Sequence, residues 1–186
     1  MKNILNLFKK NNSFSIILKY IYKMFTRKRI LIKKIFENTS QYLDKSITVC
    51  GWIENFRVQK NNGIAFISLT DGSYLTSLQV ILDPKTEEER EKLDSIYEDG
   101  TKGVSLEVTG ILVSSPAEGQ PIELKGETLK IFGKVDASEY PITKKKLTLE
   151  HLRKFPHLRI RTKTLSAISR IRNTCSLATH GFFQLH

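Results

Sequence analysis

The sequence predicts a mainly β protein: a five-stranded Greek-key barrel with a short helix between strands three and four, then a linker and a C-terminal α-helix. Three observations predict it. Runs of alternating apolar and polar residues recur between residues 47 and 132, turns rich in glycine, proline and asparagine separate them, and one charged run of helical period follows the third. A closed barrel is favoured over an open sheet, because an open sheet would leave a long edge strand that needs cover.

The five strands are defined by the turn signals at their ends. We expect them at Ile47–Gln59, Ile64–Thr70, Leu75–Leu82, Gly103–Ser114 and Ile122–Phe132. Alternate apolar residues mark the inward faces: Ala65, Ile67 and Leu69 in the second strand, Leu78, Val80 and Leu82 in the third, and Val104, Leu106 and Val108 in the fourth. Gly51 inside the first strand indicates a bend.

A short helix is expected at Lys85–Tyr97, where Leu93 and Ile96 form a thin apolar stripe. Three strands, a helix and two strands match the order of the oligonucleotide-binding fold. Ligands of that fold lie on strands two and three and on the adjoining loops, which here are Lys60–Gly63 and Ser114–Gln120.

After Phe132 the alternation stops, and a basic linker leads to a predicted amphipathic helix at Leu165–Phe183, with Ser166 as its cap. The apolar stripe of such a helix needs a partner to be stable. Two cysteines make no disulfide framework, and the four histidines show no zinc spacing, so we expect no metal site.

The net charge of +11 is unevenly distributed along the chain. Residues 1–36 hold ten Lys or Arg and no acid, residues 37–140 hold ten basic and eighteen acidic residues, and residues 141–186 hold ten basic residues and one acid. The two basic arms would attract a polyanion, although they are also compatible with simple solvation. Residues 1–28 are too charged to span a membrane and are expected to be a mitochondrial or plastid transit peptide, or alternatively a basic extension of a cytoplasmic protein.

Several stretches together resemble the asparaginyl-tRNA synthetases, from about Arg29 to Phe183. They are "ITVCGWIENFR", "FISLTDGS", "LQVIL", "SSPAEGQPIEL", "YPITKKKLTLEHLRKFPHLRIRT" and "SAISRIRNTCSLATHGFF". The resemblance implies a tRNA anticodon-binding domain at residues 29–135, a hinge at 136–163, and at 164–186 the first-motif helix of a class II catalytic domain. It also implies an asparagine–tRNA ligase that uses ATP and Mg²⁺ and forms a homodimer through that helix.

Three candidate nucleic-acid-binding residues follow from the resemblance. Phe66 matches an aromatic that stacks on an anticodon base, Gln79 a glutamine that reads the central uracil, and Arg57 a first-strand arginine near that base. Alternation supports the first two, which fall on the less apolar faces of adjacent strands. From alternation alone, Phe66 could equally plug the barrel end. Counting alternate residues from Ile53 points Arg57 inward. Phe56 is compatible with a core position.

The second and third class II motifs, which supply the ATP and amino-acid sites, are not among these residues, so no catalytic residue is assigned. A polypeptide of these 186 residues is therefore expected to need no cofactor and to show no ATP–pyrophosphate exchange with asparagine. Exchange above background would contradict this expectation. The alternative function is a free-standing module that binds tRNA or single-stranded nucleic acid without catalysis.

Overall fold

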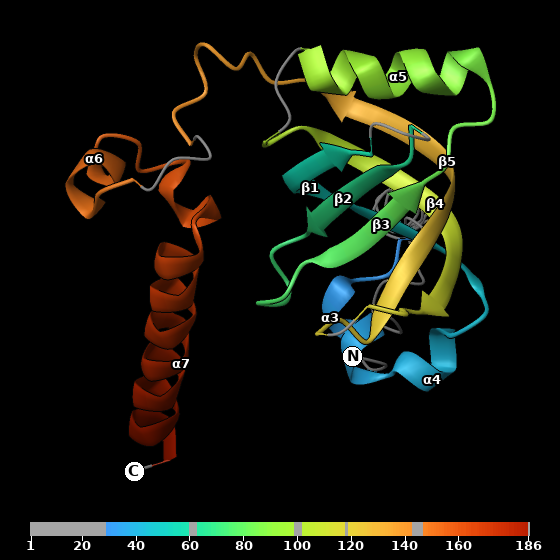
Figure 1. Ribbon diagram of the computed structural model, residues 1–186. Helices are drawn as coiled ribbons and strands as arrows, with labels where there is room; N and C mark the ends of the chain where they lie inside the picture. The colour runs from blue at the N-terminus through green and yellow to red at the C-terminus, as the bar shows by residue number, and fades with distance from the viewer. Residues whose placement is uncertain (1–28, 60–62, 99–101, 118, 143–146, 186) are drawn as a thin grey trace, which may run out of the picture.

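A closed barrel of five strands dominates the computed structural model, which describes residues 29–59, 63–98, 102–117, 119–142 and 147–185. The strands follow one another around the barrel in the order β1-β2-β3-β5-β4, with β3 and β5 parallel and the other pairs antiparallel (Figure 1). The expectations for residues 1–28, and for the predicted ligand loop Lys60–Gly63 except Gly63, lie outside the described residues.

The strands confirm the predicted order of elements. Their bounds are β1 Ser46–Val58, β2 Ala65–Thr70, β3 Leu78–Leu82, β4 Ser105–Ser114 and β5 Ile122–Gly133. The helices are α3 Ile32–Glu37, α4 Thr39–Tyr42, α5 Glu87–Glu98, α6 Leu149–Arg153 and α7 Lys163–Leu185, and η1 Arg159–Arg161 is a 3₁₀ turn. The predicted start of the third strand at Leu75 was wrong, since Leu75 is 63% exposed and belongs to the β2–β3 loop.

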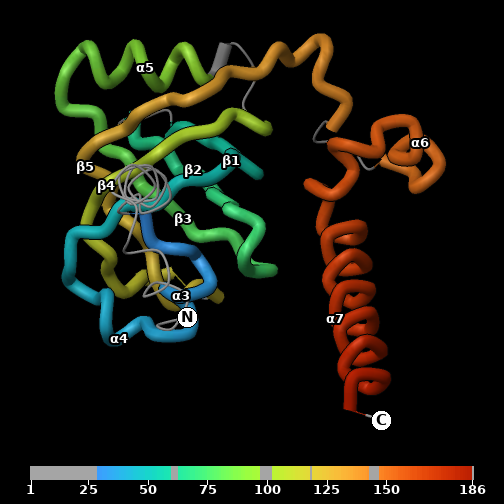
Figure 2. The backbone as a smooth tube through the Cα atoms, turned by 180° about the vertical axis from the view of Figure 1, so that it is seen from behind, coloured from blue at the N-terminus to red at the C-terminus, as the bar shows by residue number. Residues whose placement is uncertain are grey.

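The core fills the barrel and is closed at both ends by helices. The inward residues of β2, β3 and β4 are buried as alternation predicted. At one end α5 contributes Leu93 and Ile96, and at the other α3, which the sequence did not reveal, contributes Ile32 and Ile35. Both views show α5 and α3 at opposite ends of the barrel (Figures 1 and 2). The side faces of the strands are thus left for ligands.

A reciprocal pair of hydrogen bonds starts α5 after Pro84. The Thr86 hydroxyl accepts a bond from the Glu89 backbone N–H at 3.3 Å, and the Glu89 carboxylate accepts bonds from the backbone N–H groups of Lys85 at 2.8 Å and Thr86 at 3.3 Å. These backbone donors lower the pKa of Glu89. The capping box fixes where α5 begins and so how it crosses the barrel end.

A β-bulge at Glu54 resets the alternation of β1. Ile53 pairs with Leu69, but Asn55 and not Glu54 pairs with Ser68, so β1 carries one extra residue here. Beyond the bulge the faces are exchanged relative to simple counting: Phe56 is 3% exposed and lies in the core, and Arg57 is exposed. The inward position that simple alternation gave Arg57 is therefore wrong.

Gly51 has no room for a side chain. A Cβ atom at this position would lie 2.5 Å from the carbonyl oxygen of Thr70 on β2. Glycine is needed because the two backbones approach closely, as β1 passes from its pairing with β4 to its pairing with β2. The re-aiming of Arg57 comes from the bulge three residues later.

The β2–β3 loop is held from two sides. The Asp71 carboxylate accepts bonds from the Ile32 backbone N–H at the start of α3 at 2.9 Å and from the Ser73 backbone N–H at 2.8 Å. From the other side the Arg170 guanidinium of α7 donates to the carbonyl oxygens of Gly72 and Ser73. The loop is therefore the junction between the barrel and the C-terminal helix.

Helix α7 extends beside the barrel and has no buried residue (Figure 1). Its first backbone bond runs from the Ser166 N–H to the Thr162 carbonyl, so Thr162 is the cap, and the expected cap at Ser166 was wrong. Exposed apolar side chains line the helix: Ile168, Ile171, Leu177, Phe182 and Phe183. No helix in the described part of the chain is long and apolar enough to cross a membrane.

Candidate nucleic-acid interface

The outer faces of β2 and β3 carry the two residues that alternation placed there. Phe66 pairs with Ile81 across the strands, and Ser68 pairs with Gln79. All four side chains are half-buried and point away from the core, opposite to the buried Ile67 and Val80. We call Phe66, Ser68, Gln79 and Ile81 the β2–β3 outer face.

Arg57 joins this face from β1. It pairs directly with Phe66 in the β1–β2 register, and the centre of its guanidinium lies 4.6 Å from the centroid of the Phe66 ring. At this distance the cation is attracted to the electron-rich face of the ring. The structure thus brings together all three predicted binding residues, and it does so through the Glu54 bulge.

Phe66 and Gln79 are diagonal neighbours on adjacent strands. In an antiparallel pair such neighbours are about 7–8 Å apart, which one nucleobase can bridge. No hydrogen bond from the Gln79 side chain to another described residue is present, so its amide keeps both a donor and an acceptor for a ligand. The face therefore offers a ring for stacking and an amide for reading a base edge.

Glu123 on β5 borders this site, and sequence reasoning missed it. It pairs with Gln79 across β3 and β5 and is only 5% exposed. Its carboxylate accepts hydrogen bonds from the Ser115 hydroxyl at 2.9 Å and the Gln120 amide at 3.5 Å, both in the β4–β5 loop. The available signal was a carboxylate between the apolar Ile122 and Leu124, directly after a predicted ligand loop.

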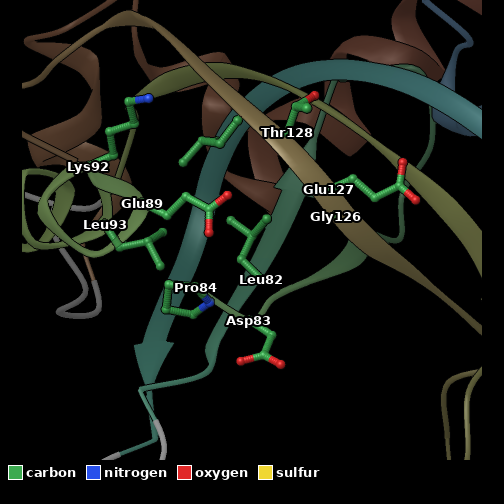
Figure 3. A pocket seen from close by; sticks show the side chains of 10 residues that line it. Leu82, Asp83, Pro84, Glu89, Lys92, Leu93, Gly126, Glu127 and Thr128 are labelled. Atoms are coloured by element: carbon green, nitrogen blue, oxygen red, sulfur yellow. The ribbon is translucent and has the colours of Figure 1, made fainter. Parts of the chain in front are cut away.

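A small cavity of about 170 Å³ lies under α5 and is a poor candidate for a ligand site. Its lining includes Leu82, Pro84 and Leu93, and Figure 3 shows the carboxylate of Glu89 among these apolar side chains. That carboxylate is already used as the helix cap. The cavity is too small for a nucleotide, since ligand pockets usually measure about 300–1,000 Å³.

A larger cavity of about 490 Å³ lies between the barrel and the C-terminal segment, and residues of both line it. The Arg161 guanidinium lies 4.3 Å from the Trp52 ring centroid, and Lys163 forms a 3.4 Å ion pair with Glu54. Because the Lys163 side chain is 76% exposed, this ion pair stabilises the contact by less than about 1 kcal/mol. Burial raises the pKa of Tyr140, which also lines this cavity, against a smaller opposing effect of Arg161.

Metal ligands do not cluster in the part of the chain that the structure describes. There, no group of three or more His, Cys, Asp or Glu side chains could hold a metal ion.

Known proteins resemble this chain in sequence. Residues 47–132 match the family model of the OB-fold nucleic acid binding domain. The chain is 40% identical to the asparagine–tRNA ligase of Cytophaga hutchinsonii over 157 residues, which are 84% of this chain and 32% of that enzyme. It is 42% identical to the asparagine–tRNA ligase of Borrelia garinii over 82% of this chain and 32% of that enzyme. The chain spans about a third of the length of these curated relatives.

The fold is shared with solved structures. The asparaginyl-tRNA synthetase of Pyrococcus horikoshii matches with a TM-score of 0.69 at 20% identity, over 84% of this chain and 35% of that one. A second structure of that protein contains asparaginyl-adenylate. The aspartyl-tRNA synthetase of Entamoeba histolytica matches with a TM-score of 0.65 at 15% identity, over 87% of this chain and 38% of that chain. At these identities the likeness shows the fold alone.

Proposed function

Because this chain belongs to the asparaginyl-tRNA synthetase family over the part that it spans, we propose that it binds the anticodon loop of the tRNA for asparagine. The protein would act in the attachment of asparagine to that tRNA, the reaction for which its curated relatives are named. We propose that the full-length enzyme uses ATP and Mg²⁺ for this reaction. The binding surface is the β2–β3 outer face together with Arg57.

The observation that carries this proposal is a half-buried aromatic ring beside an amide that bonds to no other described residue, both on one barrel face. Sequence-specific RNA recognition targets single-stranded loops, whose bases stack on aromatic side chains and are hydrogen-bonded at their edges. Phe66 supplies the stacking surface. Gln79 supplies a donor and an acceptor, which together complement the edge of a pyrimidine such as uracil.

Gln79→Ala is expected to weaken binding of the cognate tRNA by about 1 kcal/mol or more, because it removes hydrogen bonds to a base edge. It should mainly erode discrimination against a tRNA altered at the central anticodon base. Affinities for both tRNAs, measured at two salt concentrations, test this expectation.

The matched comparison is the triple neutralisation of Lys144, Lys145 and Lys146. It should lower affinity for both tRNAs alike and flatten the salt dependence, since phosphate contacts carry no sequence information. If the triple variant loses discrimination and Gln79→Ala does not, the specific and non-specific roles have been exchanged.

We also propose that α7 pairs with a second copy of the chain, forming a homodimer. Ile168, Ile171 and Phe182 lie on one face of this helix and are between 42% and 63% exposed, and such an apolar stripe needs a partner. Sedimentation velocity should show a concentration-dependent dimer that is weakened by Ile171→Asp. A monomer at all concentrations would contradict this assignment.

A further inference from the structure

We infer that Arg170 is a latch: its guanidinium joins α7 and the β2–β3 loop into one two-state element, so that the helix and the loop are fixed together or released together. The β2–β3 loop is the segment between Thr70 and Leu78, and it lies on the side of the barrel that faces α7 (Figures 1 and 2). The latch sets the angle between the barrel and α7 whether or not RNA is bound, and so goes beyond the proposed function.

Arg170 reaches from α7 to the backbone of the loop. The two terminal nitrogens of its guanidinium donate to the carbonyl oxygens of Gly72 and Ser73, the latter at 3.4 Å. Gly72 has a φ of +75°, which glycine adopts readily and other residues do not. Because a guanidinium holds its donors in a fixed fork, it binds both carbonyl oxygens only when the loop has this shape.

Asp71 ties the same loop to α3. Its carboxylate accepts hydrogen bonds from the Ile32 backbone N–H at 2.9 Å and from the Ser73 backbone N–H at 2.8 Å and hydroxyl at 2.6 Å. The Ser73 hydroxyl oxygen also accepts a bond from the Lys33 backbone N–H at 3.0 Å. Ser73 is therefore bonded to α3 and Asp71 on one side and to α7 on the other. A change in its backbone conformation would break both sets of bonds.

Packing contributes little to the seating of α7 on the barrel. The helix has no buried residue, and the cavity of about 490 Å³ lies between the barrel and the C-terminal segment. The contact of Arg161 with Trp52 precedes the helix, and the exposed Lys163 that pairs with Glu54 is its first residue. Arg170 lies about two turns further along α7. The direction of the helix therefore depends on the bonds of Arg170.

The closed latch leaves one donor unsatisfied. The Nε atom of Arg170 is buried and has no hydrogen-bond partner among the described residues. A buried donor without an acceptor costs free energy, which hydration recovers when the contact opens. The stabilisation from the two charge-assisted bonds is thus partly offset, and the closed and open states are closer in free energy than those bonds alone would make them.

The seating of α7 can be measured in the 186-residue chain with a nitroxide on Cys175, an exposed thiol of this helix, whereas Cys50 is buried. Isotope-enriched, spin-labelled chain is diluted into an excess of plain chain, so that broadening of amide signals arises within one molecule. In the wild type the signals of the β2–β3 loop should be broadened. Arg170→Met should remove this broadening, and Arg172→Met, which removes an exposed arginine of the same helix, should retain it.

Hydrogen exchange at the Ile32 and Ser73 amides reports the shape of the loop. Arg170→Met should raise both exchange rates about tenfold or more, the equivalent of one lost charge-assisted hydrogen bond, although Arg170 contacts neither amide. Arg170→Lys keeps the charge without the fork and should raise both rates similarly. Arg172→Met should leave both rates unchanged.

Coupling between two sites is reciprocal, so Asp71→Asn should release α7. The amide nitrogen that replaces one carboxylate oxygen cannot accept a hydrogen bond, and Asp71 loses its hold on the Ile32 or the Ser73 N–H. Broadening of the loop signals by the nitroxide should then fall although Arg170 is intact. Asp83→Asn, which changes an exposed acid after β3, is the charge-matched control.

Three results would overturn the latch. Retained broadening in Arg170→Met would mean that other contacts seat the helix. Lost broadening with unchanged exchange at Ser73 would mean that Asp71 alone shapes the loop. Full broadening in Asp71→Asn would mean that the helix stays seated when the loop is released. None of these measurements uses RNA, so their failure is distinct from failure of the proposed function.

Discussion

Phe66→Ala is expected to lower the affinity for the cognate tRNA about 5- to 150-fold while the barrel remains folded. Stacking of one base on one aromatic side chain is worth about 1–3 kcal/mol by alanine substitution, which gives this range. The ring lies on the outer face of β2, with the core residues Ala65 and Ile67 on the opposite face. Its removal should therefore leave the packing of the core intact.

The measurement is equilibrium binding of the anticodon stem-loop to folded protein, with circular dichroism and a melting curve on the same sample. Phe132→Ala is the matched control: Phe132 is 43% exposed and lies on β5, nine residues from the Glu123 that pairs with Gln79. That separation is about 30 Å along a strand, so RNA affinity should be unchanged. If Phe66→Ala unfolds the domain, Phe66 is a plug of the barrel end. Unchanged binding by a folded variant would remove the anticodon assignment.

The two central strands show what sequence periodicity can predict. In β2 and β3 each alternate residue is buried without interruption, so counting from Ala65 or Leu78 gives the face of every residue, including Phe66 and Gln79. This works because one face must pack into the core, and a slip of one residue would expose all of it. The candidate site could be located from the sequence to this extent.

Arg57 shows where counting fails. The extra residue at Glu54 exchanges the inward and outward faces for every residue that follows it in β1. The sequence "IENF" contains no proline or glycine that would have indicated a bulge. The bulge is visible only in the pairing with β2. A resemblance to a family pointed to Arg57, but only the register shows that it faces Phe66.

The other omissions have tertiary causes. Helix α3 has six residues, too few for a clear helical period, and its first N–H groups are held by Asp71 and Ser73, about forty positions away. Glu123 is buried because Ser115 and Gln120 of the β4–β5 loop satisfy its carboxylate. Local sequence cannot supply either partnership.

The pair of Phe56 and Phe66 offers the sharpest test of the register. Phe56 is 3% exposed and stands opposite the fully buried Ile67. It directly follows Asn55, the residue at which β1 pairs with β2 again after the bulge. Removing a buried phenyl ring costs the transfer free energy of the ring and leaves a cavity, together about 3–5 kcal/mol. We therefore expect Phe56→Ala to lower the free energy of unfolding by that amount, against less than about 1 kcal/mol for Phe66→Ala.

Urea denaturation of the two variants and of the wild type measures both values, with equal m-values as evidence that the unfolding reaction is the same. A natural domain has a free energy of unfolding of only about 5–15 kcal/mol. Phe56→Ala should therefore shift the urea midpoint strongly and can leave part of the protein unfolded even without urea. Phe56→Leu keeps most of the apolar volume and should recover much of the loss. RNA affinity of folded Phe56→Leu should equal that of the wild type. If instead Phe66→Ala is the destabilised variant and Phe56→Ala is the one that loses RNA binding, the faces of β1 and β2 are the reverse of those described, and the bulge at Glu54 does not exist in solution.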